Sequence, residues 1–586
     1  MRQLTDIGKS IIEDRYLLDG ESYEDMLIRV TNAFFTDKNK RIKFLNYLKK
    51  HWFMPATPIL SNGGTDKGLP ISCFLNAMED NLDSIIEKSS ENKRISSIGG
   101  GIGTDISALR SIGEPIKHKG TTSGIIPFCV DLDASIRAIS QGSLRRGSGA
   151  IYLNINHPEI EEFIKIRKHN GAVNRKVFAI NHGININDDF LERVINDKNL
   201  DLISPATGKI IKKVPARKLW QDILDIRMDT GEPYIVNLDT INRALPEHHK
   251  VLGLNVRQSN LCSEITLPTG IDYNNKVRTA ICCLGSINIE YYDEWKDDNE
   301  FIPLAMEFLD NVLSNFINKS KTIKGLDDAR YSAEMERSIG LGAMGLHSYL
   351  LKLNIPYDSL KAQELNKIIF KNINQKVQDT NYTLAIEYGS CPDYNNAMLS
   401  SKGRLKEGAR RFSYTQAIAP TANISYIAGS CSPSTEPLRA NIFSSKTLTG
   451  TFIIKNKYLE ILLEDLGKNT TSVWNSITEN NGSVQHLSFL TGKQKDVFKT
   501  ATEIDQIVLV KMNIDRTPYI DQAQSLNIFL EANVDKAMLN RVHLMGLRGG
   551  VKSYYYLRSV ASVRTDIIKD NDLIKDCNDD ICKVCQ

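Results

Sequence analysis

Apolar side chains recur at helical spacing near the start of the chain. Tyr23–Phe35 and Arg41–Trp52 each repeat apolar residues about every three to four positions, which predicts two amphipathic helices. Two prolines and a glycine pair between residues 55 and 64 then break the pattern. We therefore expect a small helical region over residues 1–68.

The pattern changes between about residue 70 and residue 440, where short apolar runs alternate with amphipathic segments. The runs, which suit buried strands, are Ile71–Leu75, Gly149–Ile155, Val177–Ile180, Tyr234–Val236, Arg278–Ile289 and Gln416–Ala419. The predicted helices between them include Leu82–Glu91, Pro158–His169, Pro303–Asn318 and Glu364–Tyr388. Such alternation is typical of an α/β layer or barrel.

After residue 440 the pattern is mixed, and residues 566–586 are so polar that they predict a mobile tail. We divide the chain into a helical region (1–68), an α/β catalytic domain (69–445), a C-terminal α/β subdomain (446–562) and a tail (563–586).

The composition excludes some classes of protein but does not indicate a particular function. The 586 residues are 41% hydrophobic and 24% charged, as in ordinary globular proteins. A net charge of +3 with dispersed Lys and Arg gives no reason to expect nucleic-acid binding. The N-terminus lacks an apolar signal region, and no apolar stretch is long enough to span a membrane. We expect a cytoplasmic, reducing setting, in which cysteines serve as thiols, ligands or redox groups.

Three of the ten cysteines, Cys577, Cys582 and Cys585, crowd the last ten residues. A structural zinc ion usually takes four ligands, and the tail offers three thiols without a histidine. A Cys-x-x-Cys pair on a mobile tail is better suited to thiol–disulfide exchange. No other metal-ligand spacing is present, so we predict no metal site in this chain.

Three glycine-rich stretches could suggest a dinucleotide-binding site or an ATPase loop. Gly340, Gly342 and Gly345 match G-x-G-x-x-G, but a dinucleotide site needs a strand just before the glycines, and the preceding residues are typical of a helix. The stretches at 96–107 and 142–150 lack the Lys-Ser/Thr ending of a P-loop. We expect neither a nicotinamide site nor an ATPase loop.

Eleven segments in order, spanning roughly residues 50–560, resemble the large subunit of class I ribonucleotide reductases. They are MPATPILSNGGT (54–65), LPISCFL (69–75), GGGIGTDISALRSIGEPI (99–116), AISQGSLRRGSGAIYL (138–153), HPEIEEFIKIRKHNG (157–171), SNLCSEITLPT (259–269), CCLGSINI (282–289), RSIGLGAMGLHSYL (337–350), APTANISYIAGSCSPSTEP (419–437), MNIDRTPYIDQAQSLNIF (512–529) and GGVKSYYYLRS (549–559). The resemblance implies a ten-stranded α/β barrel of two parallel five-stranded halves, with a central finger loop carrying Cys262.

The resemblance also implies the chemistry: reduction of ribonucleoside diphosphates through a cysteine radical. Cys262 matches the radical position, Glu264 the base for the 3'-OH, and Asn260 a hydrogen-bonding partner of that hydroxyl. In an extended segment these three alternate positions would face one side, so one ribose could reach all of them. Cys73 and Cys282 match the reducing pair. Cys282 is chosen over Cys283 because it begins the C-x-L-G-S-I-N pattern, and Cys129, Cys391 and Cys431 are expected to be buried packing residues.

Further positions match binding sites of the family. Substrate contacts are expected from Thr57, Ser72, Thr421, Ala422 and Asn423, with backbone N–H groups near a helix start holding the diphosphate. Asp80 and Arg110 match the site for a dNTP or ATP effector, and Gln141 and Arg145 lie in the loop that relays effector identity to the substrate.

The resemblance implies partners as well. Tyr555 and Tyr556 match a relay that receives a radical from the metal cofactor of a separate small subunit, so this chain would bind no cofactor of its own. The role of Tyr554 stays open. Cys582 and Cys585 would pass electrons from thioredoxin or glutaredoxin. We also expect a homodimer, because the family's effector site lies at a dimer interface. The residues before the PATPIL segment are too few for the family's N-terminal ATP-binding cap, which we expect to be absent.

Two other functions remain open. An adenosylcobalamin-dependent (class II) reductase would generate its radical in one chain and need no tyrosine pair. A regulatory nucleotide-binding relative that has lost catalysis is disfavoured by the full set of Cys73, Cys262, Glu264 and Cys282.

Overall fold

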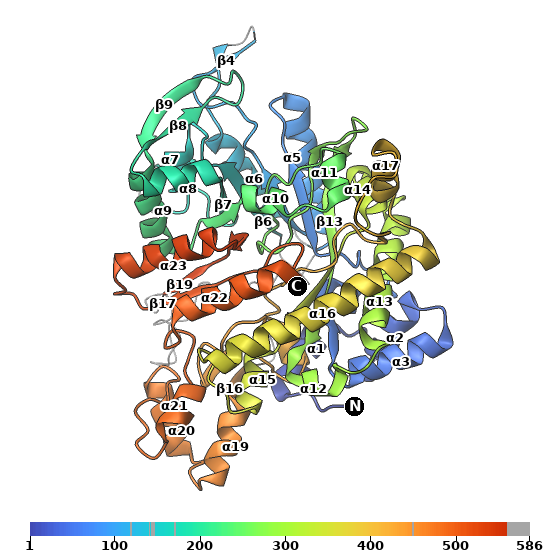
Figure 1. The fold of residues 1–586 in the computed structure, drawn as a ribbon, viewed down its shortest axis with the longest axis vertical. Helices are drawn as coiled ribbons and strands as arrows, with labels where there is room; N and C mark the ends of the chain where they lie inside the picture. Colours follow the sequence, from blue (N-terminus) through green and yellow to red (C-terminus); the bar gives the residue numbers. More distant parts are fainter. Residues whose placement is uncertain (118–119, 140, 142–146, 169–171, 448–449, 560–586) are drawn as a thin grey trace.

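The computed structural model describes residues 1–117, 120–139, 141, 147–168, 172–447 and 450–559 (Figure 1). The chain opens with four helices: α1 (Asp6–Arg15), α2 (Tyr23–Phe34), α3 (Lys38–Lys49) and α4 (Thr57–Asn62). A capping box formed by Ser22 and Asp25 starts α2, whose apolar face is buried. Helix α3 ends three residues before the predicted Trp52, because His51 adopts a positive φ of 56° and turns the chain into β1 (Phe53–Pro55). The predicted helical start of the chain is thus confirmed.

Five parallel strands form one half of the central sheet, in the order β2 (Cys73–Ala77), β3 (Gly101–Asp105), β6 (Ser148–Asn154), β7 (Asn181–Ile186) and β10 (Tyr234–Asn237). Helices α5 (Leu82–Ser97), α6 (Ile126–Ala138), α8 (Asp188–Ile195) and α9 (Ala216–Thr230) connect them. Most of these strand residues are buried, as in sheets covered on both faces. This is the five-stranded parallel half that the resemblance implies.

The other half is less regular. β13 (Ala280–Asn288) runs antiparallel to β2 and parallel to β14 (Ile339–Met344), while β1 lies antiparallel on the far edge of β13. Beyond β14 only single parallel bridges continue the sheet, from Leu341 to Gln416 and from Ile418 to Gln524. With β18 (Ser553–Tyr554) beside β10, the described residues form a nine-stranded sheet. The mixed α/β barrel architecture is confirmed, but ten regular strands are not seen in this part of the chain.

Three predicted elements differ from the structure. The run Gln416–Ala419 forms no regular strand and contributes only the single bridges at Gln416 and Ile418. Residues 177–180 form no strand, because Asp133 Oδ1 accepts hydrogen bonds from the N–H groups of Phe178, Ala179 and Ile180 and holds them in a bend. Of the helix predicted over Pro158–His169, only α7 (Ile160–Phe163) is helical, followed by turns.

Long helices cover the second half of the sheet, and α16 crosses the molecule in Figure 1. They are α13 (Phe301–Ser320), α14 (Asp327–Glu336) and α16 (Leu360–Tyr388). A lobe at one end has its own small apolar core and contains β15 (Ile442–Lys446), β16 (Thr451–Lys455), α19 (Lys457–Asp465), α20 (Thr471–Glu479) and α21 (Gly492–Val497). The described chain closes with α22 (Gln506–Arg516), β17 (Ile528–Leu530), α23 (Lys536–Arg548), β18 and β19 (Leu557–Ser559). Across all described residues, none of the helices has the length and apolar character needed to cross a membrane.

Candidate active site

The segment that carries Cys262 forms a tight turn. Ser263 has a positive φ of 64°, and Asn260 Oδ1 accepts hydrogen bonds of 3.1 Å from the N–H groups of both Glu264 and Ile265. The expected extended segment, with alternate residues facing one side, is therefore wrong. A local bond from an asparagine side chain to nearby backbone competes with extended structure and folds the segment back.

This turn lies against the parallel half of the sheet. A Cβ atom on Gly103 in β3 would come within 2.1 Å of the Ser259 carbonyl oxygen, so only glycine admits the loop here. Tyr152 in β6 donates a 2.5 Å hydrogen bond to the carbonyl oxygen of Asn260. Cys262, Glu264 and Asn260 are all fully buried, which fixes the loop as an internal element.

The two predicted reducing cysteines face each other across the junction of the half-sheets. Cys73 in β2 and Cys282 in β13 are direct partners in the antiparallel register, and both are thiols. Opposed residues in such a pair have Cα atoms about 4.5–5.5 Å apart, which is within disulfide range. Two cysteines more than 200 positions apart in the sequence are thus placed where they can form one disulfide.

Cys283 is set apart from this pair. Successive residues of a strand point to opposite faces of a sheet, so Cys283 and Cys282 face opposite sides. Burial raises the pKa of the Cys283 thiol, and the nearby Asp310 carboxylate adds to the effect. The geometry therefore favours Cys282 as the partner of Cys73.

Polar side chains of the turn contact the cysteine pair. Asn260 Nδ2 lies 3.4 Å from Cys73 Sγ, and the Cys73 thiol lies 3.9 Å from Glu264 Oε1. Burial raises the pKa of Glu264 to about 7, although hydrogen bonds from its own backbone N–H, Asn260 and Ser525 act in the opposite direction. A carboxyl group with a pKa near neutrality can accept or return a proton under physiological conditions.

A cluster of tyrosines approaches Cys262 from the other side. The Tyr555 hydroxyl lies 3.6 Å from Cys262 Sγ, and the rings of Tyr555 and Tyr556 have centroids 4.3 Å apart. Tyr554 points elsewhere, since its hydroxyl donates to the carbonyl oxygens of Val542 and His543 in α23. The structure thus brings together Tyr555, Tyr556 and Cys262 and leaves Tyr554 in a packing position.

Comparisons with known proteins agree with this geometry. The family model for the ribonucleotide reductase barrel domain matches residues 71–557, and the model for the all-alpha domain of the same family matches residues 2–68. The chain belongs to the ribonucleotide reductase family. Because the relatives that it matches are ribonucleoside-diphosphate reductase large subunits, the chain is a large subunit, and its reaction is the reduction of ribonucleoside diphosphates to deoxyribonucleoside diphosphates.

Individual relatives match over nearly their full lengths. The chain is 37% identical to the ribonucleoside-diphosphate reductase large subunit of Invertebrate iridescent virus 3, over 94% of this chain and 93% of the relative. It is 41% identical to a putative large subunit of Frog virus 3, over 89% and 88% of the two chains. Among solved structures, the class Id ribonucleotide reductase alpha subunit of Actinobacillus ureae superposes with a TM-score of 0.83 at 33% identity, covering 95% of this chain and 97% of the other.

The substrate-contact residues predicted for this reductase lie on three segments, and Ser72 is next to the cysteine pair. Ser72 Oγ lies 3.5 Å from Cys73 Sγ, and Thr57, the first residue of α4, shares a 2.9 Å hydrogen bond with Tyr16. Thr421 has a positive φ of 52° and accepts a hydrogen bond from the Ser434 N–H. Ala422 and Asn423 follow directly and lead into the short helix α18 (Ile424–Ile427).

The predicted effector residues pair with each other on loops after β2 and β3. Arg110 Nε lies 2.9 Å from Asp80 Oδ2, and both side chains are partly exposed. Gln141 Nε2 lies 3.3 Å from the carbonyl oxygen of Lys67, so this side chain reaches the segment just before β2. Arg145 and the tail cysteines Cys577, Cys582 and Cys585 lie outside the described residues.

Several residues at the reductase site were not singled out from the sequence. Tyr234 packs against both relay tyrosines, with ring centroids 4.9 Å and 5.1 Å away. Gln522 and Ser525 contact Cys282 and the Cys262 turn. The segment IDQAQSLN does contribute to the resemblance, but only the fold shows which of its side chains face the cysteines. Among the described residues, no group of three or more His, Cys, Asp or Glu side chains is arranged to hold a metal ion.

Proposed function

We propose that this large subunit reduces its substrate through a radical on Cys262, with Glu264 as the base and with Cys73 and Cys282 as the reductants. The observation that carries the proposal is that one buried turn contacts a tyrosine hydroxyl on one side and a pair of opposed thiols on the other. A Tyr555 radical would take the hydrogen atom of the Cys262 thiol: the S–H bond breaks and the tyrosine O–H bond forms.

The remaining steps balance with the groups present. Cys262 removes the 3'-hydrogen of the ribose, while Glu264 takes the 3'-OH proton and the 2'-OH leaves as water. Cys73 and Cys282 each supply one electron and one proton and become a disulfide. Of the two thiol protons, one leaves with the 2'-OH as water and the other reaches C2'. Glu264 returns its proton to the 3'-oxygen, and Cys262 returns the hydrogen to C3'. The overall change is one ribonucleotide and two thiols converted to one deoxyribonucleotide, one disulfide and one water.

The radical is proposed to come from the metal cofactor of a small subunit, through Tyr556 and Tyr555. Burial raises the pKa of Tyr555 well above its ordinary value, so the residue is a neutral phenol that must lose a proton together with an electron. The test is a reductase assay with class I small subunits, compared with added adenosylcobalamin. Product only with a small subunit supports the proposal. Product with the cobalamin alone would favour the class II alternative, and no product in either case, with nucleotide binding intact, would favour an inactive regulatory protein.

Activity should fall as the pH drops through about 7, because only the ionised form of Glu264 can accept the 3'-OH proton. Burial favours the neutral acid, so each pH unit below 7 should lower kcat/KM roughly tenfold. The measurement is kcat/KM for CDP between pH 5.5 and 8.5, with circular dichroism at each pH to monitor folding. A flat profile from pH 6 to 8 would contradict the assignment of the base.

We propose that the chain forms a homodimer and that the effector site lies beside the dimer interface. Helix α5 begins two residues after Asp80 and leaves Leu82 and Ile86 65% and 57% exposed, an apolar face that a second subunit could cover. A dNTP or ATP effector bound beside Asp80 and Arg110 would then lie next to the interface and favour the homodimer.

Replacing Asp80 with alanine should strongly weaken effector-dependent substrate choice, because Arg110 loses the carboxylate that orients it. The ratio of CDP to GDP reduction is measured with and without each effector, and the molecular mass is followed by light scattering. We expect the effector-driven change in this ratio to shrink about tenfold, as for loss of a charged hydrogen bond. A ratio that still responds as in the wild-type chain would show that the effector binds elsewhere.

The tail is proposed to reduce the buried disulfide. Cys73 and Cys282 are 4% and 0% exposed, so thioredoxin or glutaredoxin could not reach them directly, and Cys582 and Cys585 would carry the electrons in. Truncation after residue 575 should allow about one turnover per site but stop steady-state turnover with thioredoxin, and a small dithiol should partly restore it. The control is Cys577→Ser, since Cys577 could also pair with Cys582. Full thioredoxin-driven turnover by the truncated chain would rule out the shuttle.

A further inference from the structure

The segment Asp521–Ser525 contacts three reactive groups of the site. Gln522 Nε2 lies 3.7 Å from Cys282 Sγ, and the Ala523 N–H donates a 2.9 Å hydrogen bond to the Glu264 carbonyl oxygen. Ser525 Oγ donates a 2.6 Å hydrogen bond to the Cys262 carbonyl oxygen and lies 3.4 Å from Glu264 Oε2. One short segment thus borders the radical cysteine, the base and a reducing cysteine.

The side-chain amide of Gln522 has a defined orientation. Its Nε2 also donates to the Ile339 carbonyl oxygen at 3.0 Å, and its Oε1 accepts from the Thr266 N–H at 3.3 Å. A flipped amide would place an acceptor against the Ile339 carbonyl and a donor against the Thr266 N–H, so the nitrogen must face Cys282.

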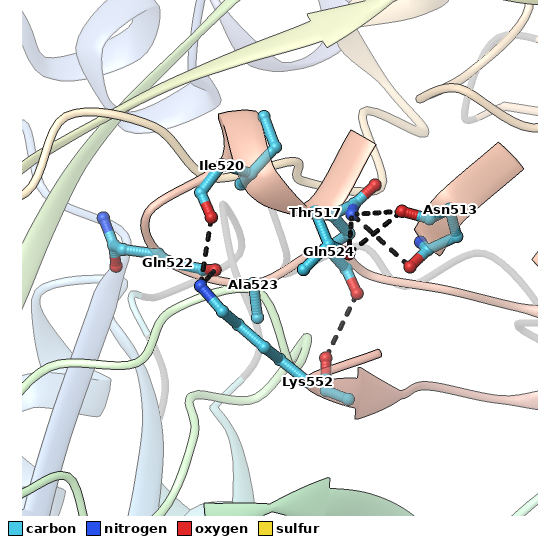
Figure 2. A pocket seen from close by; sticks show the side chains of 8 residues that line it. Asn513, Thr517, Ile520, Gln522, Ala523, Gln524 and Lys552 are labelled. Atoms are coloured by element: carbon cyan, nitrogen blue, oxygen red, sulfur yellow. Dashed lines mark hydrogen bonds between the residues drawn. The ribbon is translucent and has the colours of Figure 1, made fainter. Parts of the chain in front are cut away.

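Two charged side chains hold the backbone of this segment. The Asp521 carboxylate accepts hydrogen bonds from the Thr415 N–H and hydroxyl and from the Gln416 N–H. From the other side, the Lys552 ammonium group donates to the carbonyl oxygens of Ile520, Asp521 and Gln522 at 3.0, 2.7 and 2.7 Å. Figure 2 shows the bonds to Ile520 and Gln522. The chain is therefore fixed on both sides of the Gln522 peptide.

The side chain of Lys552 is well placed to hold this backbone. Its three donors match the three converging carbonyl oxygens, and the residue is 6% exposed. Within the described part of the chain no carboxylate lies at ion-pair distance from its nitrogen. A buried charge is costly unless hydrogen bonds satisfy it, so a lysine placed here indicates that the three carbonyls need a cation. Burial lowers the pKa of Lys552 to about 8.

We propose that Gln522 is a positioning residue for the reducing thiol Cys282, and that Lys552 acts through Gln522 by fixing its backbone. This inference rests on the proposed function. The amide hydrogen orients the Cys282 sulfur beside Cys73 and stabilises negative charge on it as its proton leaves. The hydrogen bond from Gln522 also opposes the rise in the pKa of Cys282 that burial causes.

The same segment offers a matched control two residues further on. Gln524 is also buried, but its side chain points toward Asn513 and Thr517 and away from the side chain of Gln522, as Figure 2 shows. Its Oε1 accepts from Arg516 Nε, and its Nε2 lies near Asn513 and Thr517. Removing its amide should disturb the segment without touching Cys282.

The test compares Gln522→Met, Gln524→Met and Lys552→Met in the complete enzyme with its small subunit and a small dithiol. Gln522→Met should lower kcat at least about tenfold while KM for CDP changes less than about twofold, because binding of the substrate does not use this bond. Gln524→Met should stay within about threefold of the wild type, and Lys552→Met should behave like Gln522→Met.

Gln522→Glu separates positioning from a purely structural role, because a structural role would not make the relative activity of this variant depend on pH. The introduced carboxyl group can donate toward Cys282 only when protonated, so activity relative to the wild type should rise as the pH falls. The inference is overturned if Gln522→Met keeps wild-type kcat, if Gln524→Met falls equally, or if the relative activity of Gln522→Glu does not depend on pH. A wild-type enzyme that makes no deoxynucleotide in the same assay would overturn the proposed function, and this inference with it.

Discussion

Replacing Cys262 with serine is expected to abolish deoxynucleotide formation and leave nucleotide binding intact. The serine hydroxyl has nearly the same shape, but its O–H bond is too strong for the Tyr555 radical to break, so the reaction cannot begin. Cys262 lies on the buried turn with its sulfur 3.6 Å from the hydroxyl of that tyrosine. The measurement is dCDP formed per chain, with CDP affinity by calorimetry.

The control for this variant is Cys129→Ala. Cys129 lies in α6, is fully buried among apolar residues and faces no reactive group of the site. The alanine variant should keep turnover and lose only stability, by about 1–2 kcal/mol for a small buried side chain. Substantial product from Cys262→Ser would refute the radical assignment.

Replacing Tyr555 with phenylalanine should lower turnover by about 1,000-fold, equivalent to about 4 kcal/mol in the barrier. The ring would still pack between Tyr234 and Tyr556, but the hydroxyl that faces Cys262 Sγ would be missing. Phenylalanine is much harder to oxidise than tyrosine, so the radical could not reach the cysteine. Turnover is measured with saturating small subunit, so that weaker association is not mistaken for a block.

Tyr554→Phe is the matched control because it removes a neighbouring hydroxyl with a different environment. That hydroxyl donates to carbonyl oxygens in α23, so its loss should cost about 1 kcal/mol of stability but little activity. If both phenylalanine variants retained similar turnover, the relay through Tyr555 would be wrong.

The sequence predicted strands correctly where a run of apolar residues coincides with a strand buried in the sheet. Apolar runs predicted β2, β6, β10 and β13 to within a few residues, because buried strands need apolar side chains on both faces. The domain bounds drawn from the sequence stay a prediction. The sequence misled at residues 177–180, where one buried aspartate captures three backbone N–H groups, an interaction that depends on a distant helix.

The resemblance supplied candidate residues for the site, whose roles stay a prediction, but it did not supply their geometry. Resemblance identified Cys73 and Cys282, yet only the antiparallel contact of β2 with β13 places them opposite each other. The turn at Cys262 depends on one asparagine side chain, which periodicity cannot reveal. Tyr234 and Gln522 reach the site from separate elements, so their roles could be recognised only in three dimensions.

The most direct test of the account is a single turnover without external reductant. The reduced chain is mixed with small subunit, effector and CDP, quenched by alkylation, and digested for mass spectrometry in a Cys582→Ser, Cys585→Ser background that prevents exchange with the tail. We predict one Cys73–Cys282 disulfide for each dCDP formed, with Cys283 alkylated as a free thiol. Formation of dCDP with Cys73 and Cys282 both still alkylated would contradict the proposed mechanism.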